Sequence, residues 1–460
     1  MKRGTYRLLP LLLLLTTACV PTKPPVPSQT SIIPPEAWRE SSAPVSQLPA
    51  QWWQTFGDRE LTALVEAALR NNTDVLSAVS RVDEARAQIR QARSALLPTL
   101  DGQASPQRSR SLGVTGISET TSIQPELRAS YEIDVWGRLR NQLTASRYGY
   151  QASEAERDSV RLTVASTTAR TYITLRSLDL QLRITQETNI SRQQALRVAQ
   201  DRFDLGYTSE LELTQAQSEA ESTAQLIPQL ENSVRQQENA LRLLVGELPG
   251  NVNRGKSVAE LRLPIVPGTL PSELLRRRPD IVQAEWQLAS SDKLLEAQRA
   301  AFLPQVQLSA GIGRLYVSSL NYDPVKVWDI GASVLAPIFS GGRLEAQFGV
   351  ATAQRDQAAF AYRNAVLAAL RDVENALSTN NRLAQQIERV RARRDILGRS
   401  LAIAEDRYQN GYSSYLEVLD AQRNSFDTEL SAVQLRESQL NAAADLYQAL
   451  GGGWTGREIR

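Results

Sequence analysis

Histidine and cysteine carry much of the catalytic and metal-binding chemistry of proteins, and this chain has almost none of either. It contains no histidine and a single cysteine, Cys19. A Ser-His-Asp triad, a Cys-His nucleophile pair and a zinc site built from His or Cys are therefore excluded within one chain. A disulfide within the chain is excluded too. We predict that the protein is not an enzyme and that it uses no metal or other cofactor.

One segment matches a nucleotide-binding pattern. Residues 250–257 read Gly-Asn-Val-Asn-Arg-Gly-Lys-Ser, which fits G-x-x-x-x-G-K-S. Such a loop binds phosphates only between a strand and a helix, where its backbone amides surround the ligand. Here a helical pattern precedes the segment, and prolines follow it at positions 264, 267 and 271. We therefore predict no nucleotide binding, and any energy that the protein needs must come from a partner.

Charged residues are balanced over the whole chain. Lys and Arg number 52 and Asp and Glu number 50, a formal net charge of +2. Because nucleic-acid binding favours a clustered basic surface, we predict no nucleic-acid partner. Three acidic residues, Glu212, Glu417 and Asp420, follow two glycines at the start of helical patterns. By pattern alone, a solvated helix face explains them as well as a binding site does.

The N-terminus has the pattern of a secretory signal. Basic residues at positions 2, 3 and 7 precede an apolar run over 8–15, and small residues lead to Cys19. This is a signal peptide over 1–18, and it resembles a bacterial lipobox in which Cys19 receives a covalent lipid. Thr16 departs from the usual Leu, and a plain signal peptide is the alternative. Residues 19–57 are rich in proline, which predicts an extended tether.

The rest of the chain is a tandem duplication. The segment around Gly206 and the one around Gly411 share an Asp-Arg-aromatic pattern before the glycine, and the glycines are 411 − 206 = 205 residues apart. Gly137 and Gly342, each followed by Arg-Leu, have the same offset. We predict a first repeat over 58–250, a linker over 251–268 and a second repeat over 269–460.

Each repeat begins with one predicted helical segment, over 60–95 or 272–301. Two strand-like runs follow in each repeat, at about 99–112 and 123–136 and at about 305–317 and 327–338. Apolar and polar residues alternate along them, most strictly over 123–135. A strand with one apolar and one polar face fits a transmembrane barrel with a wet lumen, although a soluble sandwich alternates as well. Four strands are too few to enclose a wide lumen, so a barrel would have to be shared by several chains.

Long helices follow the strand pairs. No proline occurs over 138–205 or 343–410, and at 1.5 Å per residue ~65 residues form ~100 Å of helix. Apolar residues after each central glycine follow the spacing of a coiled-coil seam, which Arg423 interrupts, and Pro228 should bend or interrupt its helix. No apolar run after residue 20 is long enough for a membrane-spanning helix.

With these features the chain resembles the TolC-like outer membrane factor family, in its NodT-type lipoprotein branch that serves RND-type efflux pumps. The most specific match is residues 407–422, Arg-Tyr-Gln-Asn-Gly-Tyr-Ser-Ser-Tyr-Leu-Glu-Val-Leu-Asp-Ala-Gln. The resemblance implies an α+β membrane protein, a homotrimer with a twelve-stranded β-barrel, four strands from each chain. A twelve-helix periplasmic α-barrel of long coiled-coil helices would continue it. The resemblance further implies that the protein lies in the cell outer membrane and that its partners are a periplasmic adaptor and an inner-membrane pump.

The resemblance also assigns site residues. Gly206 and Gly411 become the periplasmic tip turns on which an adaptor docks. The residues implied at the gate are a gate tyrosine, a hydrophobic plug and acidic rings: Tyr408, Leu416, Glu417, Asp420 and Glu212. A ring of three carboxylates would attract cations. Ser413 stands where some members have an arginine, which leaves no arginine latch at that position.

The function implied is a passive, gated export duct for drugs, metals or other small solutes. A type I secretion duct is an alternative within the same class. A coiled-coil envelope lipoprotein with a structural or adaptor role and no pore is an alternative from a different class. Four amphipathic strands of membrane length argue against that last reading, since a periplasmic scaffold does not need them.

Overall fold

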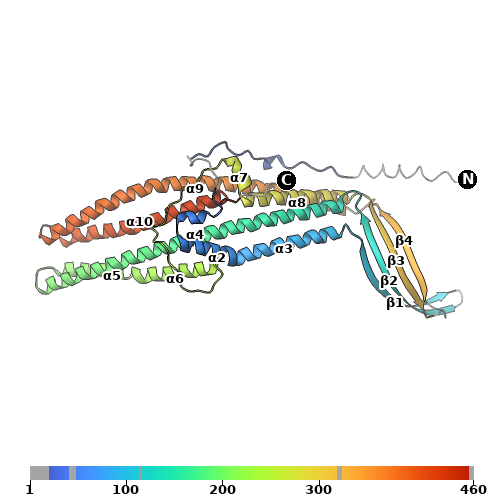
Figure 1. Cartoon of the computed structure of the whole chain (residues 1–460), viewed down its shortest axis with the longest axis horizontal. Coiled ribbons are helices and arrows are strands. Elements are labelled where there is room, and N and C mark those ends of the chain that lie inside the picture. Colours follow the sequence, from blue (N-terminus) through green and yellow to red (C-terminus); the bar gives the residue numbers. More distant parts are fainter. Residues whose placement is uncertain (1–19, 41–47, 114–115, 319–323, 455–460) are drawn as a thin grey trace. The chain divides into compact units, whose positions relative to one another are not determined.

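The computed structural model describes residues 20–40, 48–113, 116–318 and 324–454. The predicted signal peptide and Cys19 lie outside these ranges. Figure 1 shows long helices and one group of strands, which in chain order are η2 (Ser28–Thr30), η3 (Trp52–Phe56), α2 (Arg59–Asn71), α3 (Thr73–Ser94), β1 (Thr99–Gly113), β2 (Gly116–Ile133), α4 (Arg138–Asp204), α5 (Glu210–Ala224), α6 (Leu226–Leu244), α7 (Pro271–Arg277), α8 (Pro279–Ala300), β3 (Gln305–Val317), β4 (Val325–Leu335), α9 (Arg343–Gln409) and α10 (Tyr415–Ala449).

The two halves of the chain repeat the same order of elements. Helices α4 and α9 are each 67 residues long, as expected where no proline interrupts the backbone hydrogen bonds. The returning helix is continuous in the second half, as α10. In the first half it is divided into α5 and α6, and Pro228 lies in the first turn of α6, where a proline is tolerated. The predicted effect of Pro228 is therefore confirmed.

The helices before the strands differ from expectation, because each is divided in two. Asn72 separates α2 from α3, and its side-chain oxygen accepts hydrogen bonds from the amides of Asp74 (2.9 Å) and Val75 (3.4 Å). This is an N-cap, which begins a new helix rather than continuing the old one. In the second half Pro279 begins α8 directly after Arg278, whose backbone is extended, as the residue before a proline prefers.

The four strands form one antiparallel sheet in the order β1-β2-β3-β4. Its register aligns apolar residues across the sheet: Leu127 pairs with Ile312, which pairs with Trp328. The next row, one residue along, holds Arg128, Gly311 and Asp329. One face is therefore apolar and the other polar, as the alternation predicted. Within the described part of the chain, β1 and β4 each pair with another strand on one side only.

The boundaries of β2 and β4 differ from the predicted ones. β2 begins at Gly116, seven residues before the predicted start at residue 123. β2 ends at Ile133, not at residue 136, because the Asp134 carboxylate accepts hydrogen bonds from the amides of Leu139 (3.1 Å) and Arg140 (2.8 Å) at the start of α4. β4 ends at Leu335, two residues before Pro337, which cannot donate a backbone hydrogen bond to a sheet. The C-terminal ends of β2 and β4 are therefore determined by residues just beyond each strand.

The described chain divides into two compact units, each built from both repeats. Unit 1 holds the sheet and the helix segments next to it in the chain, from the described residues of 20–32, 80–154 and 283–364. Unit 2 holds the described residues of 33–79, 155–282 and 365–454, including both glycine turns. Among the described helices, none has a stretch long and apolar enough to cross a membrane.

The N-terminal segment is not a free tether. In unit 1, Lys23 pairs with Asp292 at 2.6 Å and Glu296 at 3.1 Å, both on α8. Arg355 of α9 donates to the carbonyls of Pro24 and Pro25. In unit 2, η3 is core rather than tether: Trp52, Trp53 and Phe56 are buried, and Trp52 stacks on Tyr447 of α10 with 5.1 Å between ring centroids. Their burial places the end of the predicted 19–57 tether inside a folded unit.

Candidate functional site

Both central glycines end a long helix with the same hydrogen bonds. The amide of Tyr207 donates to the carbonyl of Arg202 at 2.8 Å, and that of Tyr412 to Arg407 at 2.8 Å. These are the bonds of a Schellman motif, which needs a left-handed residue just after the helix. Gly206 and Gly411 supply it with φ of +75° and +77°. The duplication therefore builds two matching hairpin turns in unit 2.

A polar cluster next to these turns joins the two hairpins. The Tyr408 hydroxyl on α9 donates to one carboxylate oxygen of Glu212 on α5. Arg202 on α4 donates to the same hydroxyl at 2.8 Å, and its guanidinium lies over the Tyr408 ring, 5.1 Å from the centroid. Thr208 donates to the other oxygen of Glu212, and the Tyr415 ring of α10 lies 5.4 Å from that of Tyr408. Both carboxylate oxygens and the phenol are thus engaged.

The surroundings keep Tyr408 in its protonated form. Burial raises the pKa of Tyr408 to about 12, and the neighbouring Glu212 carboxylate raises it in the same direction, while Arg202 opposes them. The phenol is therefore a hydrogen-bond donor throughout the physiological pH range. A carboxylate acceptor makes this one of the stronger kinds of hydrogen bond.

A second charged cluster lies farther along the same helices from the glycine turns. Glu219 of α5 pairs with Arg192 of α4 at 2.7 Å, and its other oxygen accepts from Nε of Arg423 on α10 at 2.6 Å. Arg192 also donates to the Thr223 hydroxyl at 2.6 Å and lies over the Phe426 ring. Sequence reasoning gave these residues no role. The signal was present, because Arg423 occupies a position in a coiled-coil seam that is mostly apolar and that contains one other charged residue, Glu437.

Three predicted gate residues lie apart from these clusters. Leu416, Glu417 and Asp420 are exposed on α10, whereas the neighbouring Tyr415, Val418 and Leu419 are buried. Asp420 accepts a hydrogen bond from Asn424 on its own helix at 3.1 Å. Within one chain the structure therefore brings Tyr408 and Glu212 together, and it leaves Leu416, Glu417 and Asp420 on a free helix face.

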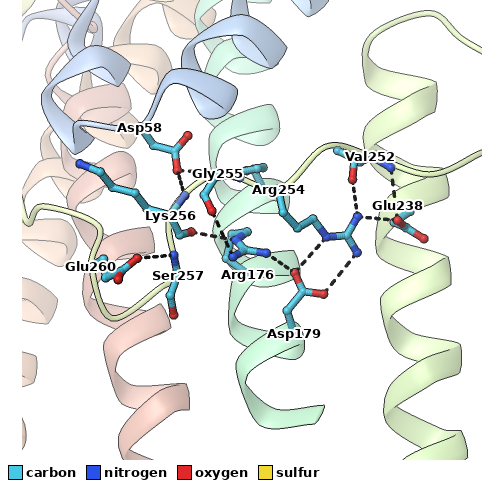
Figure 2. A network of polar contacts seen from close by, with 11 residues as sticks. Asp58, Arg176, Asp179, Glu238, Val252, Arg254, Gly255, Lys256, Ser257 and Glu260 are labelled. Carbon is cyan, nitrogen blue, oxygen red and sulfur yellow. Dashed lines mark hydrogen bonds and ion pairs between the residues drawn. The ribbon is translucent and has the colours of Figure 1, made fainter. Parts of the chain in front are cut away.

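The segment that matches the phosphate-binding pattern is a linker bound to unit 2, and several of its backbone amides already donate to other residues of this chain (Figure 2). The amide of Gly255 donates to the Tyr172 hydroxyl at 3.0 Å. The amide of Lys256 donates to the Asp58 carboxylate at 2.7 Å (Figure 2). A Cβ on Gly255 would lie 2.4 Å from an Asp58 oxygen. The glycine thus serves the close approach of a carboxylate from this chain, and neither a strand nor a helix flanks the loop directly.

Arginines attach the same linker to two helices (Figure 2). Arg254 pairs with Asp179 of α4 at 3.0 Å and with Glu238 of α6 at 2.5 Å. Arg176 of α4 donates to the carbonyl of Lys256 at 2.8 Å. The pattern over 250–257 therefore reflects packing of the connection between the repeats.

Comparison with known proteins agrees with this architecture. The model of the family described as outer membrane efflux protein matches residues 64–247 and 270–452, one match in each repeat. The pyoverdine export outer membrane protein OpmQ of Pseudomonas putida is 34% identical over 97% of both chains. The probable outer membrane lipoprotein SilC of Salmonella typhimurium is 33% identical over 94% of this chain and 93% of its own.

A solved structure supports the fold as well. The outer-membrane channel OprN superposes with a TM-score of 0.84 at 26% identity, over 92% of this chain and 99% of that one. The predicted family, fold class and outer-membrane location are confirmed, and the proteins matched are channels rather than enzymes. The chain belongs to the outer membrane efflux protein family and is an outer-membrane channel component of an efflux system.

Proposed function

We propose that three copies of this chain close one passive duct, gated at the hairpin turns. The sheet supports the first part. β1 and β4 pair on one side only in the described chain, and exposed backbone groups are not tolerated in a bilayer. Pairing β1 of one copy with β4 of the next satisfies both edges, and three copies of four strands make a barrel wide enough for a lumen.

The gate consists of an inner ring and the contacts that hold it. A three-fold axis along the helices turns Leu416, Glu417 and Asp420 of each copy into rings. The bonds from Tyr408 to Glu212 and from Arg202 to Tyr408 hold the α9–α10 hairpin against the α4–α5 hairpin. While they persist, the rings stay narrow. The Tyr408–Glu212 bond is the observation that carries the proposal.

Opening follows from docking at the turns. The apolar side chains of Leu205, Tyr207 and Tyr412 are 71%, 80% and 77% exposed there, which suits contact with the helical tip of a periplasmic adaptor. An inner-membrane pump of the RND type supplies the energy, and the solutes exported are drugs, metals or other small compounds.

A covalent lipid on Cys19 anchors the N-terminus to the outer membrane. The intact mass of the mature protein tests this. We expect residues 19–460 plus the mass of the acyl groups, and a mass without them would reject lipidation.

The gate is tested by single-channel conductance in planar bilayers. Tyr408→Phe keeps the ring but removes the donor, and Glu212→Gln removes the charge of the acceptor. We expect conductance several-fold above wild type in both variants, because each weakens the bond between the hairpins. The control is Tyr412→Phe, the same change on an exposed ring at the neighbouring turn, which should behave as wild type.

The acidic rings are tested in the same bilayers. A Glu417→Ala, Asp420→Ala double variant should lose cation preference. If both Tyr408→Phe and Glu212→Gln had the conductance of wild type, the gating role of the Tyr408–Glu212 hydrogen bond would be rejected. The assignment of the protein as a channel would not be affected. An unchanged ion preference in the acidic double variant would reject the ring assignment.

A further inference from the structure

A cavity of about 570 Å³ lies in unit 2, away from the turns and from the residues assigned to the duct. It lies between α4, α9, α10 and the linker between the repeats. Its apolar lining comes from all four: Leu180, Ile184, Val258, Ile387 and Val433. This volume is within the range of small-molecule sites, which are largely apolar with a few placed polar groups.

The polar groups of the cavity are mostly basic. Arg391 and Arg394 enter it from α9 and Arg436 from α10, with Glu429 as the single carboxylate among the lining residues. Arg391 and Arg394 also pair with Glu388 at 3.2 Å and Asp395 at 3.3 Å on their own helix. These pairs are more than half exposed, and exposed pairs of this kind contribute little.

Arg436 differs from two other half-buried arginines of this unit in the partners that it has. Arg254 pairs with two carboxylates, Asp179 and Glu238, and Arg278 with two others, Asp280 and Asp372. Within the described part of the chain, Arg436 donates only to neutral acceptors, the Gln439 side-chain oxygen at 2.7 Å and the Leu261 carbonyl at 2.5 Å.

Burial lowers the pKa of Arg436, and the neighbouring Arg391 guanidinium lowers it further. The hydrogen bonds of Arg436 to described residues reach neutral oxygens and no carboxylate. A cation removed from water without a counter-charge is costly. An anion in this cavity would remove that cost.

We propose that this cavity binds a small anionic amphiphile, an apolar body bearing one carboxylate, sulfate or phosphate. The acidic group contacts Arg436 together with Arg391, and the apolar body lies on the Leu180, Ile184 and Val433 side chains. A guanidinium suits such groups because its donors match their paired oxygens. The site does not depend on the gate proposal, since none of its residues belongs to the turns or rings.

The test uses the full lipidated chain in nanodiscs of phosphatidylcholine, with 2-naphthalenesulfonate as the probe. Binding is measured by isothermal titration calorimetry, with empty nanodiscs subtracted. We expect saturable binding that weakens with salt, and none of comparable strength for the uncharged 2-naphthalenemethanol. Because a hydrogen bond to a charged group contributes well over 1 kcal/mol, Arg436→Gln should weaken binding about tenfold.

Two further variants separate loss of the site from loss of the fold. Arg391→Gln removes the exposed partner without disturbing buried packing and should also weaken binding. Arg389→Gln removes an exposed arginine of the same helix that does not line the cavity, and it should bind as wild type. Equal affinity in wild type, Arg391→Gln and Arg436→Gln would overturn the proposal, as would equal affinity for the uncharged probe.

A second copy of the chain covering the cavity is the competing outcome. Ala259→Cys introduces a thiol at an exposed lining position of the linker. We expect a water-soluble maleimide to label it in the assembled protein, and saturating 2-naphthalenesulfonate to protect it. Failure to label before any probe is added would show the cavity to be covered by protein and would overturn the proposal.

Discussion

Tyr408 and Glu212 are 196 residues apart in the chain, and their contact is the residue-scale basis of the proposed gate. The acceptor is charged, and the hydroxyl also receives a hydrogen bond from Arg202. A phenol between a carboxylate and a guanidinium is held in a single orientation. Removing either Tyr408 or Glu212 leaves a polar group of the other side chain half-buried without a hydrogen-bond partner. Such a group lowers the stability of the fold.

The response of this link to pH follows from the raised pKa. Burial and Glu212 raise the pKa of Tyr408 from 10.0 to about 12. A raised pKa means that the fold favours the protonated phenol, so the link is complete below pH 10 and is lost as the pH rises through about 12. We expect the conductance of wild type to stay at its closed value at pH 10.5. Any increase in conductance above pH 10.5 should be absent from Tyr408→Phe. Opening of wild type at pH 10 would contradict the assignment.

The buried carboxylate of Glu219 makes a second residue-scale prediction. Arg192 and Glu219 are 8% and 6% exposed, so removing the charge of Glu219 leaves the buried Arg192 without its carboxylate partner. Glu219→Gln should destabilise unit 2 by about 3 kcal/mol, seen as a lower midpoint of thermal unfolding by circular dichroism. Glu221→Gln, an exposed change on the same helix, is the control. Equal midpoints for the two variants would show that the cluster contributes nothing to stability.

At the scale of elements, the turns depend on backbone geometry more than on contacts. A Cβ added to Gly411 would meet no atom within 4 Å, so space does not exclude a side chain. The backbone φ of Gly411, +77°, disfavours a side chain there, because a left-handed conformation costs an L-residue about 1 kcal/mol or more. The same argument holds for Gly206.

Two alanine substitutions with opposite expected signs test this. Gly411→Ala should destabilise by about 1 kcal/mol. Gly398→Ala should stabilise by a similar amount, because Gly398 lies within α9 with open space around it and alanine is the better helix former. Thermal midpoints of the two purified variants give the comparison. A lower midpoint for Gly398→Ala than for Gly411→Ala would refute the explanation.

At the scale of the whole molecule, the two faces of the sheet should have different roles. Ile330 and Asp329 are neighbours on β4 and lie on opposite faces. An arginine facing lipid costs about 2–4 kcal/mol near the middle of the bilayer, whereas a lumen position tunes selectivity. The proposed trimeric barrel places Ile330 toward lipid and Asp329 toward the lumen.

Ile330→Arg should therefore reduce the amount of oligomer recovered from outer membranes, measured by mobility on unheated gels. Asp329→Arg should insert normally and shift the conductance away from cations. If Asp329→Arg failed to insert while Ile330→Arg inserted normally, the assignment of the two faces would be reversed. That result would exclude the proposed barrel, in which Ile330 faces lipid.

Much of this architecture could be predicted from the sequence because it depends on local rules. Alternation over 123–135 identified β2, and the absence of proline over 138–205 identified α4. The matching glycines revealed the duplication. Predictions were wrong where one side chain decides a boundary. Asn72 divides a helix by capping the next one, and Asp134 ends β2 by capping α4.

The sequence by itself determined the elements, their duplication and the turn glycines, because periodicity, proline and left-handed glycine act within a few residues. Only the tertiary structure decided which side chains meet. Arg423 bonds to Glu219, 204 residues away in the chain, whereas the hydrogen bonds of Arg436 to described residues reach only neutral oxygens. Such pairings depend on how each hairpin is rotated about its own axis against the other. A rotation of that kind changes every contact between hairpins while leaving each local pattern intact.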